Sequence, residues 1–117
     1  GTVIAGVSAG AGCWFSQILS DNSGAGLAPL AGLGWLEASL CPHYSEEPHR
    51  RLAFEALIAS SELSAGYAID DGAGIIIENG QTLGYITARP NSAAYFIRQN
   101  NASTETMMLD EVRNMPL

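Results

Sequence analysis

A serine stands in a run of small residues directly after an apolar segment. Residues 6–10 read Gly-Val-Ser-Ala-Gly, and residues 2–7 are apolar and partly β-branched, as in a buried strand. A serine hydroxyl is a weak nucleophile unless a tight strand-to-helix turn presents it to a base, and small flanking residues permit such a turn. We therefore predict that Ser8 is a nucleophile. The backbone N–H of Ala9, at the start of the following helix, is expected to donate to an oxyanion.

Two histidines could supply the base that such a nucleophile needs. His43 follows Pro42 in a polar turn at the end of an apolar segment, the position from which α/β enzymes present their functional groups. His49 falls in the first turn of an expected helix, beside Arg50 and Arg51, where a solvated role is the ordinary one. We favour His43 as the base, with a capping or surface role as its alternative.

A base of this kind is oriented by a carboxylate. Asp70 and Asp71 precede Gly72 between two short apolar segments, and either could accept the imidazole N–H and stabilise the imidazolium. The alternative is that both only shape the turn. Less favoured carboxylates are Glu46, Glu47 and Asp21. The expected chemistry is acyl transfer, and the chain order serine, histidine, acid differs from the serine, acid, histidine order of α/β-hydrolases.

The cysteines and histidines do not have the spacing of a metal site. Cys13 and Cys41 are single, and no carboxylate or cysteine lies at ligand spacing around the two histidines. We expect no metal or other cofactor. The cysteines are interpreted as free thiols of a reducing compartment, with a disulfide as the alternative.

Composition excludes several classes of partner. The chain has 117 residues, enough for one domain and too few for two. Lysine is absent, and five arginines against twelve acidic residues give a net charge of −7, which disfavours nucleic-acid binding. Apolar stretches are broken by Gly, Pro and Ser well short of a membrane span. We expect a soluble, cytoplasmic protein.

Hydrophobic spacing and turn residues outline the elements that must position these groups. Strands are expected at residues 2–7, 35–40, 67–69, 73–78, 81–86 and 94–98. Asn79-Gly80 is a strong hairpin signal. Helices are expected at 11–19 and 48–60, the second opened by Pro48. Residues 20–34 are expected to form a long loop, and the tail from residue 100 a short helix or a frayed end. This order favours a mixed three-layer α/β domain.

Four ordered blocks carry a resemblance to a known family. They are Gly-Val-Ser-Ala-Gly-Ala at 6–11, Cys-Pro-His-Tyr at 41–44, Glu-Pro-His-Arg-Arg at 47–51 and Gly-Tyr-Ala-Ile-Asp-Asp-Gly at 66–72. Together they resemble the C-terminal half of the aspartyl dipeptidase (peptidase E) family of serine peptidases, which is related to cyanophycinase. The resemblance implies the C-terminal portion of a three-layer α/β/α domain similar to class I glutamine amidotransferases.

The resemblance also implies roles for particular residues. The family's serine falls on Ser8, its histidine on His43 and its acid on Asp71, although some members carry a glutamate at that place. Members favour small peptides, in particular dipeptides with an N-terminal aspartate. Recognition of such a carboxylate calls for an arginine fork, and Arg50 and Arg51 are the candidates. Their alternative is a solvated helix face paired with nearby glutamates.

Residues 2–7 also bear on the extent of the domain. They read as a buried strand at the very start of the chain, and a buried strand needs neighbours on both sides. We therefore expect residues 1–117 to form a single, partial domain. It is expected to join a complementing N-terminal chain, which would supply a second oxyanion donor, or copies of itself. The alternative function is an inactive interaction module that keeps the serine turn.

Overall fold

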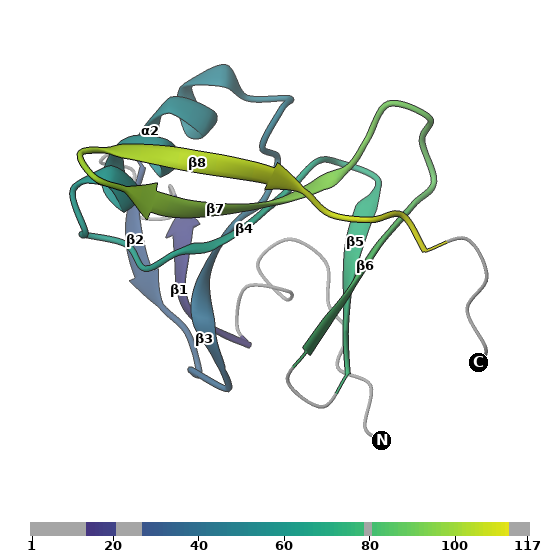
Figure 1. Cartoon of the computed structure of the whole chain (residues 1–117), viewed down its shortest axis with the longest axis horizontal. Helices are drawn as coiled ribbons and strands as arrows, with labels where there is room; N and C mark the ends of the chain where they lie inside the picture. The colour runs from purple at the N-terminus through teal and green to yellow at the C-terminus, as the bar shows by residue number, and fades with distance from the viewer. Residues whose placement is uncertain (1–13, 21–26, 79–80, 113–117) are drawn as a thin grey trace.

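The computed structural model describes residues 14–20, 27–78 and 81–112. These residues form a mixed α/β structure of mostly strands with one helix (Figure 1). In chain order the elements are β1 (Phe15–Ser20), β2 (Ala28–Ala31), β3 (Leu36–Cys41), α2 (Pro48–Ala59), β4 (Gly66–Ile69), β5 (Ala73–Glu78), β6 (Gln81–Thr87), β7 (Ala94–Asn100) and β8 (Ser103–Met108).

The main sheet has six strands in the order β2-β1-β3-β4-β7-β8. Strands β1, β3 and β4 are parallel neighbours, whereas β2, β7 and β8 pair antiparallel with their neighbours. Parallel neighbours need a crossover connection, and α2 lies in the connection between β3 and β4. The carboxyl ends of β3 and β4 consequently meet at one edge of the sheet, and the turns that follow them lie side by side.

Helix α2 begins and packs as its sequence predicts. Pro48 occupies the first turn, where its missing N–H is not needed. Arg50, Phe54 and Ile58 recur every four residues on the buried face, and the helix contacts β3, β7 and β8. Leu52, on the other face, is exposed. No helix in the described part of the chain is long and apolar enough to cross a membrane.

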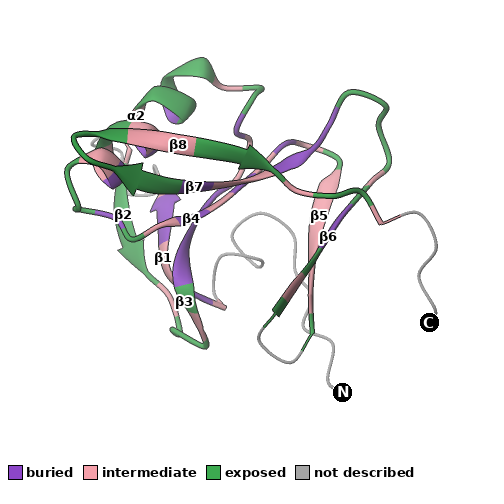
Figure 2. Cartoon of the chain, in the orientation of Figure 1, coloured by how far each residue is buried: buried purple, intermediate pink, exposed green. Residues whose placement is uncertain are grey.

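Both faces of the main sheet are buried around its centre (Figure 2). Adjacent residues of β3 point to opposite faces, so Cys41 joins the cluster under α2 and Leu40 joins the cluster on the other face. The cluster under α2 consists of Leu19, Cys41, Tyr44, Phe54, Ile58, Leu63, Ala68 and Ile97. The opposite cluster consists of Phe15, Ile18, Ala38 and Leu40, with Ile77 of β5 packed against it.

Strands β5 and β6 form a separate two-stranded sheet that projects from the main one (Figure 1). Glu78 pairs with Gln81, which confirms the predicted hairpin, although Asn79 and Gly80 themselves lie outside the described residues. The chain from residue 110 runs close against β6. The N–H of Tyr85 donates to Asp110 O at 2.9 Å, and that of Val112 donates to Tyr85 O at 2.8 Å.

Three sequence-based expectations are corrected. Residues 14–19 belong largely to strand β1 and not to a helix. Phe15, Ile18 and Leu19 are buried. Because both faces of the strand are covered, apolar residues occur three and four positions apart, which is also the spacing of a helix face. The expected loop at 20–34 contains β2, and the expected helical or frayed tail contains β8. These two edge strands are mostly exposed and therefore lack the alternation that identifies a half-buried strand.

The other described elements are confirmed. Strands near 35–40, 67–69, 73–78, 81–86 and 94–98 and the helix near 48–60 appear within two residues of the expected bounds. The expected strand at 2–7 lies outside the described residues.

Candidate active site

His43 lies in the turn that follows β3. Its backbone is left-handed, with φ at 55°, which is uncommon for a residue with a side chain. The turn is held against the neighbouring strand, because the N–H of Tyr44 donates to Ile69 O at 3.1 Å. Within the turn, the N–H of Glu47 donates to His43 O at 3.3 Å. The imidazole is therefore projected from a constrained backbone.

Asp71 meets His43 from the turn that follows β4. His43 Nδ1 and Asp71 Oδ1 form a hydrogen bond. Both side chains are 35% exposed, so the pair lies at the surface edge of the sheet. With the Nδ1 proton donated to the carboxylate, Nε2 carries the imidazole lone pair. This is the geometry of a base whose tautomer and orientation are set by an acid.

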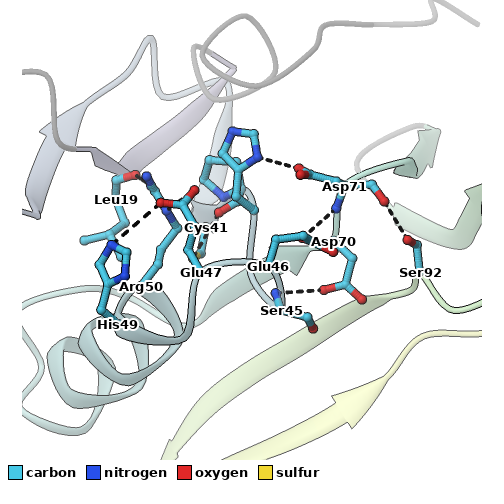
Figure 3. Close-up of polar contacts among 12 residues, drawn as sticks. Leu19, Cys41, Ser45, Glu46, Glu47, His49, Arg50, Asp70, Asp71 and Ser92 are labelled. Atoms are coloured by element: carbon cyan, nitrogen blue, oxygen red, sulfur yellow. Dashed lines mark hydrogen bonds and ion pairs between the residues drawn. The ribbon is translucent and has the colours of Figure 1, made fainter.

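The backbone of Asp71 is held on both sides (Figure 3). Its N–H donates to Glu46 Oε1 at 2.9 Å, and its carbonyl oxygen accepts from Ser92 Oγ at 2.6 Å. Glu46 comes from the turn after β3 and Ser92 from the segment before β7. Sequence reasoning did not find Ser92, because a serine in the polar run 90–92 carries no signal of its own.

The two adjacent aspartates point in different directions (Figure 3). Asp70 is buried and accepts hydrogen bonds from Ser45 N–H and Ala93 N–H, whereas Asp71 faces His43. Of the carboxylates left open by the sequence, Asp71 is thus the one bonded to His43 among the described residues. Glu47 instead lies 3.6 Å from His49 Nε2, and Asp21 lies outside the described residues.

Arg50 and Arg51 occupy different surroundings. The Arg50 side chain is only 6% exposed; one of its guanidinium nitrogens donates to Leu19 O at 3.1 Å, and its Nε lies 3.5 Å from Glu47 Oε2. Arg51 is 55% exposed, lies 3.5 Å from Glu55 Oε1 and stacks over the Tyr44 ring at 5.3 Å. Of the two, only Arg51 presents its guanidinium to solvent.

Tyr44 turns inward beside His43 and packs under α2. It is buried and its hydroxyl donates to Glu55 Oε1 at 2.7 Å. Burial and this bond raise the pKa of Tyr44, so it stays neutral. Cys41 is also buried, which raises its pKa to about 12; it has the character of an inert core thiol. In the described residues, no group of three or more histidines, cysteines or carboxylates could hold a metal ion.

Ser8 and Ala9 lie outside the described residues, as does Cys13. Of the predicted site, the structure therefore describes His43 and Asp71. The described residues thus form a mixed α/β structure in which a histidine and an aspartate, presented at the carboxyl ends of parallel strands, are bonded to each other.

Comparisons with known proteins place the chain in a family. The model of peptidase family S51 matches residues 1–84, and the chain belongs to this family, the peptidase E or aspartyl dipeptidase family. The chain is 44% identical over 95 residues to an uncharacterized peptidase, YgaJ, of Bacillus subtilis (strain 168). The match covers 81% of this chain and 41% of that relative, so the chain spans about two fifths of its length. No solved structure matches significantly.

Proposed function

We propose that the protein works as a serine peptidase in which Ser8 is the nucleophile, His43 the base and Asp71 the orienting acid. The observation that carries the proposal is the bond between His43 Nδ1 and the Asp71 carboxylate, made where the parallel strands β3 and β4 end. Membership of peptidase family S51 supports it, as does the position of Ser8 in the run 6–10.

The proposed chemistry is acyl transfer. His43 Nε2 takes the hydroxyl proton of Ser8 as the serine oxygen attacks the peptide carbonyl carbon. The Ala9 N–H stabilises the resulting oxyanion, and Asp71 stabilises the imidazolium. His43 then gives its proton to the leaving amine, the C–N bond breaks, and an acyl-enzyme remains. Water, deprotonated by His43, attacks this ester and releases the acid, which restores the Ser8 hydroxyl.

The whole protein is proposed to be a three-layer α/β/α domain similar to class I glutamine amidotransferases. Residues 1–117 would form one partial domain of it, completed by a further N-terminal chain or by copies of itself. The parallel strands β1, β3 and β4 and the packing of α2 on one sheet face support this proposal. The 41% coverage of the relative is consistent with it.

The proposed substrates are small peptides, in particular dipeptides with an N-terminal aspartate. Arg51 is the better candidate for binding the substrate carboxylate, because its side chain is 55% exposed and, among the described residues, contacts Glu55 and the Tyr44 ring. Arg50 was the other candidate, but its buried guanidinium already binds Leu19 O and pairs with Glu47. Its present role is to join α2 to β1.

Labelling with a fluorophosphonate probe tests the proposal. The folded wild-type chain, alone and with its N-terminal complement, should be modified at Ser8, as located by peptide mass spectrometry. His43→Gln should abolish labelling, and the matched change His49→Gln should leave it intact. Absence of labelling in a folded, complemented sample would contradict the peptidase proposal and favour an inactive interaction module.

A further inference from the structure

Asp70 is the most buried carboxylate among the described residues, with 2% of its surface exposed. Its Oδ1 accepts from Ser45 N–H at 3.1 Å, and its Oδ2 accepts from Ala93 N–H at 3.0 Å and from the Tyr95 hydroxyl at 3.5 Å. Its own N–H donates to Ala93 O at 3.0 Å. A buried charge is tolerated when several donors satisfy it in this way.

These bonds tie together three segments that are distant in sequence. Ser45 belongs to the turn after β3, Asp70 directly follows β4, and Ala93 precedes β7. The Tyr95 ring also packs on Tyr44, with centroids 5.5 Å apart. The Asp70 carboxylate therefore joins the turn that carries His43 to the segment before β7, which also contains Ser92.

His43 needs such a restraint. Its left-handed backbone, with φ at 55°, persists only where surrounding bonds over-determine it. Ser45, two residues after His43 in the same turn, donates its N–H to the Asp70 carboxylate. If the turn relaxed, the imidazole would move relative to Asp71, whose carbonyl oxygen is held by Ser92 from a different segment.

We infer that Asp70 is a positioning residue that fixes the His43 turn against Asp71, so that the two adjacent aspartates divide the work of holding and orienting the base. Its effect on hydrolysis depends on the proposed function, whereas its effect on the His43–Asp71 bond does not. An asparagine cannot replace it, because an amide NH₂ would face a backbone N–H where the carboxylate offers a second acceptor.

The Tyr95 hydroxyl supports this account. Burial raises the pKa of Tyr95, and the neighbouring Asp70 charge raises it further. The hydroxyl therefore stays protonated and can donate to Asp70. Tyr95→Phe keeps the ring against Tyr44 and removes this donor, together with the hydrogen bond between the hydroxyl and the Ser45 side chain.

Proton NMR on the 117-residue chain tests the inference without any activity. A proton shared by His43 Nδ1 and a carboxylate resonates far downfield, and His43→Gln assigns the signal by removing it. Asp70→Asn should broaden or shift that signal, whereas Asp110→Asn, the same change at an exposed aspartate, should not. If Asp70→Asn prevents folding, Tyr95→Phe should itself broaden or shift the signal. An unchanged signal in whichever variant is folded overturns the inference.

Kinetics on an Asp-X dipeptide provide the second measurement. Misplacement of a base by about 1 Å can cost about 100-fold in rate, so Asp70→Asn should lower kcat by up to that factor with KM nearly unchanged. A folded Asp70→Asn enzyme with wild-type kcat would make Asp70 merely structural and overturn the inference. Activity retained by Ser8→Ala would instead overturn the proposed function and leave the NMR result standing.

Discussion

At the scale of residues, the site depends on one contact between two turns. His43 and Asp71 are 28 residues apart in sequence and are bonded to each other. Asp70 is turned to the interior, where its carboxylate accepts hydrogen bonds from the N–H groups of Ser45 and Ala93. The two neighbouring aspartates thus have different partners. Mutation of Asp71 should therefore act on the His43 side chain directly, and mutation of Asp70 should act on the backbone around it.

Asp71→Asn is expected to lower kcat by about 10⁴-fold, because an amide in place of the carboxylate favours the wrong imidazole tautomer. The unfolding temperature should change little, since Asp71 is partly exposed. Steady-state kinetics and thermal unfolding check both expectations. Asp110→Asn is the control at an exposed position, and a loss below tenfold in Asp71→Asn would remove this residue from the mechanism.

At the scale of elements, the site depends on how closely β3 and β4 approach. Gly66 opens β4 opposite Ser39, and a Cβ placed on Gly66 would lie 2.1 Å from Ser39 Oγ and 2.2 Å from Ser39 O. The backbone of β3 occupies that space, so only glycine allows this pairing. The spacing of the two strands in turn sets the spacing of the turns that carry His43 and Asp71.

Gly66→Ala should therefore destabilise the fold by about 3 kcal/mol or more, as overpacking against backbone does. Gly74→Ala is the matched control, because a Cβ there would meet only Ile86 Cγ1 at 3.8 Å. Denaturant unfolding of both variants measures the difference. Equal midpoints would show that β3 and β4 can separate without cost.

The adjacent arginines of α2 provide a second test of element packing. Arg50→Ala should destabilise the protein by about 1.5–3 kcal/mol, because it removes a charged donor from the buried Leu19 carbonyl. Arg51→Ala should cost less than about 1 kcal/mol, since the Arg51 side chain that pairs with Glu55 is itself 55% exposed. Urea unfolding midpoints of the two variants measure the difference. A larger loss of stability for Arg51→Ala than for Arg50→Ala would contradict the structure.

At the scale of the whole molecule, apolar side chains remain on the surface of the described residues. Leu33 and Trp35 are 62% and 65% exposed and lie next to the exposed edge strand β2. Large exposed apolar side chains beside an open strand edge favour association with another chain.

We expect the purified chain to associate with itself when no N-terminal complement is present. Light scattering should then give a mass above the 12.3 kDa of one chain. Leu33→Gln should weaken the association, while the exposed residue Leu52 on α2, changed in the same way, serves as the control. A compact, cooperatively unfolding monomer of 12.3 kDa would contradict this expectation.

Much of the fold follows from local signals in the sequence. The hairpin at 78–81, helix α2 behind Pro48 and the strands around His43 and Asp71 were predictable, because turn residues and apolar spacing act over a few residues. Strand β1 was not, since a strand covered on both faces loses its period of two. The exposed edge strands β2 and β8 were not either, because their pairing depends on a neighbour and not on a buried face.

For the site, the sequence by itself determined the set of chemical groups: a serine in a small-residue turn, a histidine after one strand and two aspartates after another. Only the tertiary structure shows which of the two aspartates is bonded to His43. Asp70 and Asp71 have the same side chain and adjacent positions, and they differ only in direction. That direction is set by the parallel pairing of β3 and β4 and by the donors of Ser45 and Ala93, which come from segments far away along the chain.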